Sequence, residues 1–391
     1  MKYNFDKVID RSGTSAEKVE GLKHIWGRTD LIPLWVADMD FATAPFVTDA
    51  IRKRCENEVL GYTGKPDSYY NAIINWVKQR YDLIVTKEVI NFVPGIVPGI
   101  GMAMNCFTQK GDKVMIQPPV YHPFAWVTTR NERTLVINPL KWENGMYRMD
   151  LDAFREQIKG CKLFILCNPH NPGGVVWTEA ELRAIADICY DEKVLVFSDE
   201  IHADLTLPPH THRPFATVSE KARMNSVTFM SPSKAFNMPG LSASHALIFN
   251  EDLRKRFRIY MDAGELDMGH VFAFLSVEAA YSHGTEWLDQ CLAYIQGNID
   301  FVDEFLKKHA PKIKAIRPEA SYLVWLDCRE LELSQKDLNE LLVDKAHLAL
   351  NDGEMFGKEG IGFMRLNVAS PRCIIEKAMK QLADAYQLYI K

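Results

Sequence analysis

The sequence predicts an α/β fold: a large domain with a mostly parallel seven-stranded sheet flanked by helices, and a smaller α+β domain beside it. Two observations carry this prediction. Short apolar segments recur seven times between residues 89 and 249, and helix-length segments separate several of them. Such alternation is typical of an open, mostly parallel sheet with helices on both faces. A long helical stretch near Thr285–His309 then leads away from this sheet toward a second, smaller set of elements.

The individual elements follow from apolar periodicity and turn residues. The seven strands are predicted at Val89–Val93, Lys113–Gln117, Thr134–Asn138, Leu163–Cys167, Val194–Ser198, Ser226–Met230 and Ala246–Phe249. Helices are expected from Pro45, up to Trp76, at Gly99–Phe107 and at Glu179–Tyr190. In the smaller domain, strands are expected at Tyr322–Leu326 and Phe363–Val368, with helices near Gln335–Lys345 and Pro371–Leu388.

These patterns predict three regions. Residues 1–45 form an N-terminal arm and part of the small domain, residues 46–285 form the large domain, and residues 286–391 form the small C-terminal domain. The first thirty residues are polar with little periodicity, so we expect them to wrap around other elements rather than to form a core element.

Composition narrows the class of protein. The 391 residues carry a formal net charge of -5, with 47% hydrophobic and 25% charged residues, an ordinary globular balance. Nucleic-acid binding is not expected, because it needs a basic face. No apolar run reaches membrane-spanning length, and the start has no signal-peptide core. The eight scattered cysteines form no C-x-x-C pair, so we expect a reduced, cytoplasmic protein.

One lysine stands between two predicted buried strands. Lys234 follows Ser231 and Ser233 directly after the strand Ser226–Met230. A buried lysine has a lowered pKa and a nucleophilic amine, which can form a Schiff base with an aldehyde cofactor. The two hydroxyls would suit a phosphate beside it. Considered alone, the segment also fits an ordinary surface loop, since most lysines are exposed.

Two further strand ends carry polar residues. Asp199 follows the strand Val194–Ser198, and Asn171 lies in the loop after Leu163–Cys167, between two prolines. Because ligands of open parallel sheets bind at the carboxyl ends of the strands, these residues are candidates for a common site. Asp199 could keep a ring nitrogen protonated, and Asn171 could bind a phenolic oxygen. The structural alternatives are a helix cap for Asp199 and a plain loop for Asn171.

Two groups of possible metal ligands are given other interpretations. Asp38 and Asp40 lack a nearby histidine or third acid, so we expect them to cap the helix that begins near Pro45. His202, His210 and His212 have a spacing that fits no compact metal site. No metal is therefore predicted.

Taken together, these motifs resemble the fold-type I pyridoxal-phosphate (PLP) enzymes of the class I/II aminotransferase family, and within it the branch of C–S lyases (cystathionine β-lyases). The resemblance extends from Trp-Val-Ala-Asp-Met-Asp-Phe at residues 35–41 to Met-Arg-Leu-Asn-Val at residues 364–368. Each motif is weak by itself, but five of them occur in the family's order.

The resemblance implies a role for each matching residue. Lys234 would bind PLP covalently, Asp199 would pair with its ring nitrogen, Asn171 would bind its phenolic oxygen and Tyr121 would stack on its ring. The phosphate would lie on the amides of Ile96 and Val97 with the hydroxyls of Ser231 and Ser233, and Tyr62 of a neighbouring subunit would reach it. Arg365 would bind the substrate carboxylate, and Asn171 would lie beside it. The implied assembly is a homodimer with shared active sites. The alternatives are a core or surface position for the two tyrosines and a structural salt bridge for Arg365.

Two departures from the aminotransferase pattern resemble the lyase branch. Ser242 stands where many aminotransferases have a phosphate-binding arginine, and His202 stands where they have a tyrosine. The implied function is PLP-dependent α,β-elimination on cystathionine or related cysteine S-conjugates, giving pyruvate, ammonia and a thiol. An aminotransferase on the same fold is the alternative. A regulatory protein without turnover is a third interpretation, which is disfavoured because none of the residues with an implied chemical role has been lost.

Overall fold

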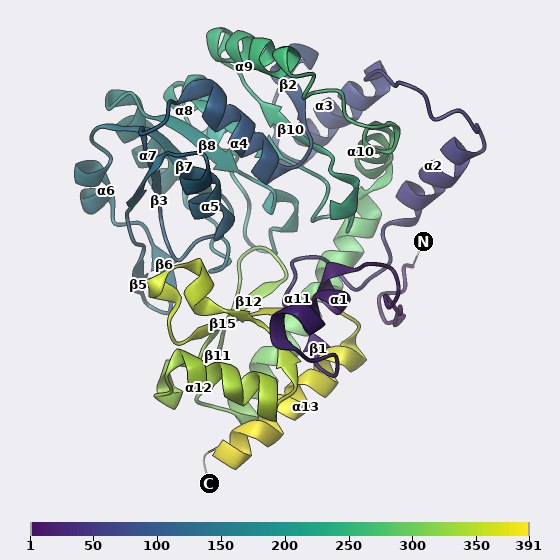
Figure 1. The fold of residues 1–391 in the computed structure, drawn as a ribbon, viewed down its shortest axis with the longest axis vertical. Helices are drawn as coiled ribbons and strands as arrows, with labels where there is room; N and C mark the ends of the chain where they lie inside the picture. Colours follow the sequence, from purple (N-terminus) through teal and green to yellow (C-terminus); the bar gives the residue numbers. More distant parts are fainter. Residues whose placement is uncertain (1, 390–391) are drawn as a thin grey trace.

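The computed structural model describes residues 2–389, in which a seven-stranded and a four-stranded sheet lie one above the other and are joined by a long helix (Figure 1). The larger sheet has seven strands in the order β2-β10-β9-β8-β7-β3-β4. Its strands are β2 Ile90–Val93, β3 Lys113–Ile116, β4 Thr134–Ile137, β7 Cys161–Cys167, β8 Leu195–Asp199, β9 Ser226–Met230 and β10 Ser244–Leu247. Only β10 runs antiparallel to its neighbours. The predicted fold class is confirmed.

Helices cover both faces of this sheet, because successive strand residues point to opposite sides. On β7, Leu163 and Ile165 pack into one core together with α4 and α9, while Phe164 and Leu166 pack into another core together with α7. The helices of this part are α2 Pro45–Cys55, α3 Asp67–Tyr81, α4 Ile96–Phe107, α5 Pro123–Arg130, α6 Leu151–Gln157, α7 Glu179–Asp191, α8 Glu220–Met224, α9 Glu251–Ala263 and α10 Val271–His283.

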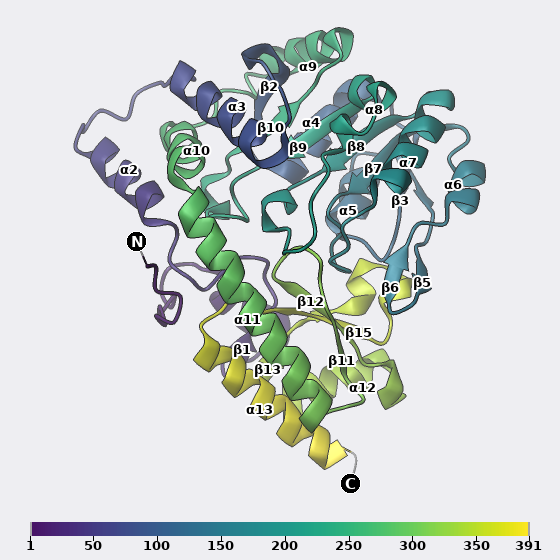
Figure 2. The same cartoon turned by 180° about the vertical axis from the view of Figure 1, so that it is seen from behind.

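The smaller part is built on a four-stranded antiparallel sheet with the order β11-β12-β15-β14. Helix α11 (Thr285–His309) runs from the large sheet to the small one, and α13 (Arg372–Tyr389) lies beside its lower half (Figure 2). The other elements are β11 Lys314–Ile316, β12 Leu323–Asp327, α12 Gln335–Glu340, β14 Asn351–Asp352 and β15 Phe363–Asn367. The boundaries at residues 45 and 285 stay a prediction.

The N-terminal residues contain regular elements that the sequence analysis did not predict. They contain a helix, α1 (Glu17–Trp26), and a short strand, β1 (Ile32–Pro33), which pairs in parallel with β13 (Leu348–Ala349). The sequence missed α1 because only Leu22 and Gly21 of its uncharged residues are buried, too few for a periodic signal. It also missed the hairpin of β5 (Lys141–Glu143) and β6 (Met146–Arg148).

The expected capping role of Asp38 and Asp40 is wrong. Helix α2 starts after Ala44 without a side-chain cap. The two carboxylates instead form ion pairs with Arg11 and Lys18 of the N-terminal arm.

No helix within residues 2–389 is both long enough and apolar enough to cross a membrane.

Candidate active site

A cavity of about 270 Å³ lies at the carboxyl ends of the large-sheet strands. Eight of the predicted site residues line it: Ile96, Val97, Tyr121, Asn171, Asp199, His202, Ser233 and Lys234. They lie at or shortly after the carboxyl ends of different strands, as the rule for open parallel sheets predicts. Two of the remaining predicted residues, Ser231 and Arg365, lie close behind the wall, and the third, Tyr62, lies elsewhere.

Lys234 reaches the cavity from the loop after β9. Its Nζ donates a hydrogen bond of 2.5 Å to the backbone carbonyl of Ala37, which belongs to the N-terminal arm. Desolvation lowers the pKa of Lys234 to about 8, and the Arg365 guanidinium acts in the same direction, whereas Asp38 and Asp199 oppose the shift. An amine with this pKa is partly neutral near pH 7 and can act as a nucleophile or base.

Asp199 ends the central strand β8 and is buried. Its Oδ1 accepts a hydrogen bond of 3.1 Å from the Ile201 amide. Burial raises the pKa of Asp199 to about 7, and the neighbouring Glu200 raises it further while Lys234 opposes the shift. A carboxyl group in this state can share a proton with a basic nitrogen in the cavity.

One end of the cavity suits an anion. Helix α4 begins there at Ile96, and its first-turn amides have no acceptor inside the helix, so they and the helix dipole favour negative charge. Gly95 precedes the helix with φ 125°, a conformation that favours glycine. The Ser233 side chain lines the same cavity.

Ser231 lies just behind that end instead of lining it. Its hydroxyl donates to the Ala243 carbonyl at 2.8 Å and lies 2.7 Å from the Ser233 hydroxyl. Ser231 therefore positions Ser233 and ties the loop to its neighbour.

Arg365 comes from β15 of the small sheet and is buried next to the cavity. Its Nη1 donates to Asn171 Oδ1 at 3.1 Å, and its Nη2 donates to the Trp35 carbonyl at 3.1 Å and to Asn351 Oδ1 at 2.5 Å. Its Nε has no acceptor among the described residues. The carboxylate partners of an ordinary structural salt bridge are replaced here by neutral oxygens, so the guanidinium keeps its charge available for an acid.

His202 and Tyr121 complete the wall. The pKa of His202 is lowered to about 3 by burial, with Lys234 and Arg365 contributing, so the imidazole is neutral. Its Nδ1 is buried and has no hydrogen-bond partner among residues 2–389. Burial raises the pKa of Tyr121, and nearby Asp199 adds to the shift, so the phenol keeps its proton.

Tyr62 is the predicted residue that this chain does not bring to the site. Its side chain is 98% exposed, in the loop between α2 and α3. Sequence reasoning in turn missed Ala37 and Tyr322, since a backbone carbonyl leaves no signal in a sequence and Tyr322 belonged to a predicted strand.

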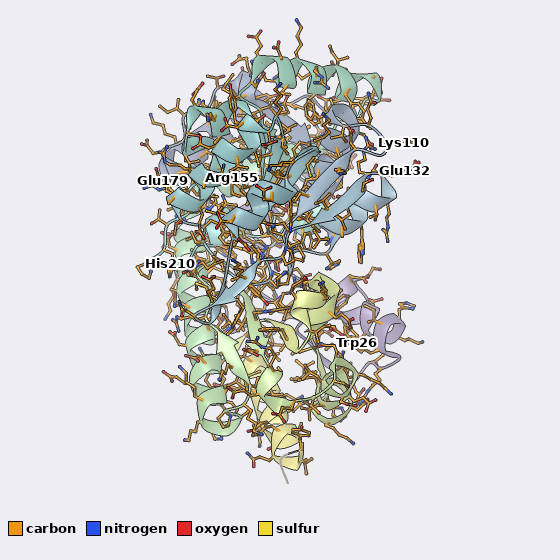
Figure 3. The ribbon with its side chains drawn as sticks, turned by 90° about the vertical axis from the view of Figure 1, so that its left-hand side faces the viewer. Trp26, Lys110, Glu132, Arg155, Glu179 and His210 are labelled. Atoms are coloured by element: carbon orange, nitrogen blue, oxygen red, sulfur yellow. The ribbon has the colours of Figure 1, made fainter. Side chains whose placement is uncertain are left out.

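The metal interpretation of the histidines finds no support within the described chain, which contains no cluster of three potential ligands. His212 Nε2 lies 2.8 Å from Glu200 Oε2 in the core. His210 lies at the molecular edge near Glu319 (Figure 3).

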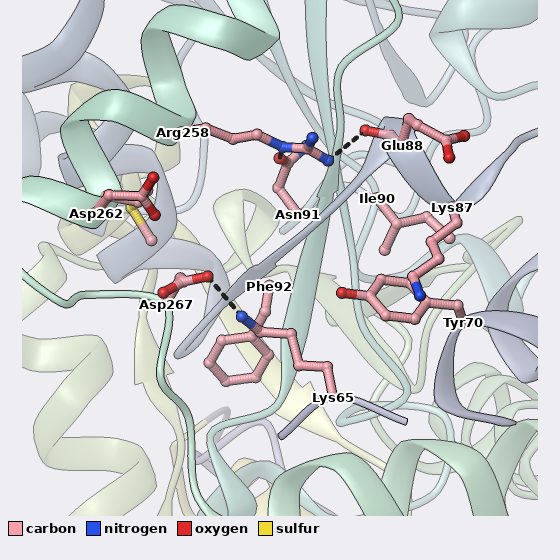
Figure 4. A pocket seen from close by; sticks show the side chains of 11 residues that line it. Lys65, Tyr70, Lys87, Glu88, Ile90, Asn91, Phe92, Arg258, Asp262 and Asp267 are labelled. Carbon is pink, nitrogen blue, oxygen red and sulfur yellow. Dashed lines mark hydrogen bonds and ion pairs between the residues drawn. The ribbon is translucent and has the colours of Figure 1, made fainter. Parts of the chain in front are cut away.

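A second cavity, of about 300 Å³, lies beside the edge strand β2 (Figure 4). Three of its charged side chains have partners in the structure: Lys65 pairs with Asp267 at 2.5 Å, and Arg258 donates to Asn91 and to the Glu88 carbonyl. None of the predicted site residues lines it.

Comparison with known proteins agrees with this geometry. The family model for aminotransferase class I and II matches residues 29–382. Cystathionine beta-lyase PatB of Bacillus subtilis (strain 168) is 38% identical, over 98% of this chain and 99% of the relative. Cystalysin of Treponema denticola, whose crystal structure contains PLP, superimposes with a TM-score of 0.96 at 33% identity, covering both chains completely. The PLP-bound C–S lyase of Staphylococcus hominis superimposes with a TM-score of 0.91 at 35% identity over 98% of each chain.

The family match covers nearly the whole chain, and the relatives are matched from end to end. The chain therefore belongs to the aminotransferase class I and II family.

Proposed function

We propose that this protein is a PLP-dependent carbon–sulfur β-lyase that cleaves cystathionine or related cysteine S-conjugates to pyruvate, ammonia and a thiol. The observation that carries the proposal is one cavity holding the amine of Lys234 and the acid of Asp199, each with a pKa moved toward neutrality by burial. The identity to PatB and the likeness to two C–S lyase structures support the lyase branch.

The residues present fit PLP. The α4 amides of Ile96 and Val97 and the Ser233 hydroxyl would hold its phosphate, and Asn171 would hold its phenolic oxygen. Asp199 would face the ring nitrogen. Tyr121 would stack on the ring, and His202 would lie near it. Lys234 would hold the aldehyde carbon covalently. When bound, PLP withdraws electrons from the α-carbon of an amino acid.

The chain's own residues then act on the substrate. Arg365 would bind the α-carboxylate of the substrate and so orient its Cα–H bond toward Lys234. The Lys234 amine, free once the substrate is bound, would take the α-proton as general base. The proton then sits on Nζ, from which it can reach the sulfur that leaves the β-carbon. Tyr121, which keeps its proton, is a second donor at the cavity wall.

Asp199 supports this chemistry by its protonation behaviour. A carboxylate buried beside a basic ring nitrogen gains its strongest partner when that nitrogen carries a proton. The proton that Asp199 shares would keep the ring of PLP an effective electron acceptor.

Elimination and transamination share the removal of the α-proton and differ in the next step. Ser242, which lines the cavity with φ 46°, takes the place of the arginine of many aminotransferases. The departure at Ser242, the histidine at position 202 and the names of the relatives favour elimination.

We also propose a homodimer in the cytoplasm. Val59, Leu60 and Tyr62 are all strongly exposed in one loop, an arrangement suited to burial against a second copy. All eight cysteines are free thiols, as a reducing compartment favours.

The decisive measurement is product stoichiometry with cystathionine. We expect one pyruvate, one ammonia and one homocysteine per turnover, without any keto-acid co-substrate. A strict requirement for a keto-acid acceptor would instead identify an aminotransferase.

A further inference from the structure

The N-terminal arm contributes a partly buried ion cluster behind the active site, here called the Arg11 cluster, formed by Arg11, Lys18, Asp38 and Asp40. Arg11 binds Asp38 through both terminal nitrogens, at 2.6 and 3.1 Å, and Asp40 at 3.0 Å. Lys18 is fully buried and binds Asp40 at 2.8 Å. A lysine without solvent exposure is rare unless it is paired.

The segment that ends at Asp38 of this cluster, Trp35–Asp38, presents its backbone carbonyls to functional side chains. The Trp35 carbonyl accepts from Arg365 Nη2 at 3.1 Å. The Ala37 carbonyl accepts from Lys234 Nζ at 2.5 Å and from the Tyr322 hydroxyl at 3.0 Å. One strip of backbone therefore contacts both the proposed base and the proposed carboxylate-binding residue.

The strip is fixed on its other sides as well. Asn367 donates to the carbonyls of Val36 and Asp38, at 2.6 and 2.7 Å. Asn237, three residues after Lys234, accepts from the Met39 amide and donates to the Met39 and Phe41 carbonyls. The lysine loop is thus joined to Met39 and Phe41, which directly follow the strip.

We propose that the Arg11 cluster is a positioning device for the reaction: it holds the Ala37 carbonyl where this oxygen receives the Lys234 amine whenever the amine is free. The inference rests on the proposed function, because only a reaction that releases Lys234 during turnover needs such a resting place. The Ala37 carbonyl accepts a hydrogen bond from the Lys234 amine while the lone pair of Lys234 Nζ takes the α-proton. The carbonyl then binds the resulting ammonium more strongly than the neutral amine. Asp38 adds a negative charge close behind this carbonyl.

The charged groups that act on Lys234 come from three parts of the chain. Asp38 on the strip and Asp199 on β8 favour its charged form, and Arg365 on β15 opposes it. His202 is neutral, and Tyr322 keeps its proton because burial raises its pKa. Asp38 itself is compensated by Arg11 and Lys18 and shares them with Asp40. Removing the charge of Asp38 should therefore lower the pKa of the Lys234 amine, and removing the charge of Arg11 should raise it.

The test uses the full chain with Asp38→Asn, Arg11→Gln and Arg11→Lys. The first readout is the pH dependence of kcat for pyruvate release by the holoenzyme, whose acidic limb reports Lys234 in the substrate complex. The second is independent of turnover: the rate at which PLP added to the cofactor-free chain forms its absorbing linkage with Lys234, measured against pH.

Asp38→Asn should move both midpoints to lower pH by about half a unit, which raises the neutral amine and the linkage rate at pH 7 about threefold. It should also lower the plateau of kcat at least tenfold with KM changed less than threefold. Arg11→Gln, a change at a partly exposed site that tests the proposal even if Asp38→Asn does not fold, should move the midpoints to higher pH. Arg11→Lys keeps a positive charge at this position, so its midpoints should lie close to those of the unaltered chain.

The matched control is Arg28→Gln. Arg28 also lies on the arm and also forms ion pairs, with Asp30 and Asp344, but it lies away from the cavity lining. It should leave both midpoints and kcat unchanged. Midpoints in Asp38→Asn and Arg11→Gln that equal those of Arg28→Gln would overturn the positioning role. Failure of the unaltered chain to release pyruvate would instead refute the proposed function.

Discussion

At the scale of single residues, the cavity brings an acid and an amine to similar pKa values. Burial moves the pKa of Asp199 up to about 7 and that of Lys234 down to about 8. Both shifts arise mainly because burial removes a charge from water. In the cofactor-free chain, the ionised form of each side chain therefore costs free energy. The residues that suit the reaction are thus unfavourable for the stability of the protein without its cofactor.

Asp199→Asn should stabilise the cofactor-free chain at pH 8 while abolishing turnover. The native carboxyl keeps its proton up to about pH 7, whereas the unfolded one loses it near 3.8, so native stability falls as pH rises between these values. The full penalty, about 4 kcal/mol at most, is present above pH 7. Thermal unfolding at pH 5 and pH 8 measures the difference.

The Asn variant should show a higher Tm than the unaltered chain at pH 8 and a smaller change between the two pH values. Asp384→Asn, an exposed position on α13, is the control and should change neither. If the unaltered chain and Asp199→Asn lost the same amount of Tm between pH 5 and pH 8, this would argue against a buried, protonated Asp199.

Arg365→Lys should fail nearly as completely as Arg365→Ala. The guanidinium bonds Asn171, Asn351 and the Trp35 carbonyl through its two terminal nitrogens, and a lysine ammonium cannot reproduce this planar arrangement. We expect kcat/KM for amino-acid substrates to fall by about 2–4 kcal/mol of transition-state binding. Steady-state kinetics with cystathionine measures it; a lysine variant within threefold of the original would show that charge alone is enough.

At the scale of elements, the N-terminus of α4 depends on how closely this helix approaches the sheet. Gly99 makes the approach possible: a Cβ at this position would lie 2.9 Å from Val93 Cγ2 on β2 and 3.1 Å from Phe229 Cε1 on β9. Two strands therefore fix the height of the helix. The amides of its first turn, which line the anion end of the cavity, are placed by that contact.

Gly99→Ala should push α4 away from the sheet and weaken PLP binding at least tenfold. Overpacking of this kind costs about 1–3 kcal/mol of stability, so Tm should fall as well. Gly101→Ala on the same helix is the matched control, because its Cβ would meet only side-chain ends, those of Val127 at 3.3 Å and Asn131 at 4.0 Å. Titration of PLP into both cofactor-free variants tests this, and equal affinities would contradict it.

At the scale of the whole molecule, the cavity is assembled from three regions of the chain. The large sheet supplies Lys234 and Asp199, the small sheet supplies Arg365, and the N-terminal arm supplies the Ala37 carbonyl. The proposed homodimer would add a fourth contribution, Tyr62 of a neighbouring subunit.

Coexpression of Lys234→Ala and Tyr62→Phe chains with different tags tests this sharing. In a hybrid dimer, one site would combine an intact Lys234 with an intact Tyr62 from its neighbour. With random pairing, about a quarter of the original activity should return from two weakly active parents. If Tyr62 served its own chain, or if the protein were a monomer, activity would stay at the level of the parents.

The sequence by itself determined the seven strands of the large sheet and placed Asp199, Asn171 and Lys234 at strand ends. Both results rest on local signals, since buried strands are short apolar runs and polar residues that interrupt them stand out. Because the carboxyl ends of parallel strands share one edge, the convergence of these residues on a cavity was also predictable.

Only the tertiary structure decided the role of the first forty residues. Asp38 and Asp40 had the local setting of helix caps, yet they pair with Arg11 and Lys18, which lie between 20 and 29 residues earlier in the chain. Likewise Ser231 bonds the Ala243 carbonyl, and Lys234 bonds the Ala37 carbonyl. The reason is physical: a hydrogen bond or an ion pair depends on which groups folding brings within about 3 Å, and backbone carbonyls are identical at every position of a sequence.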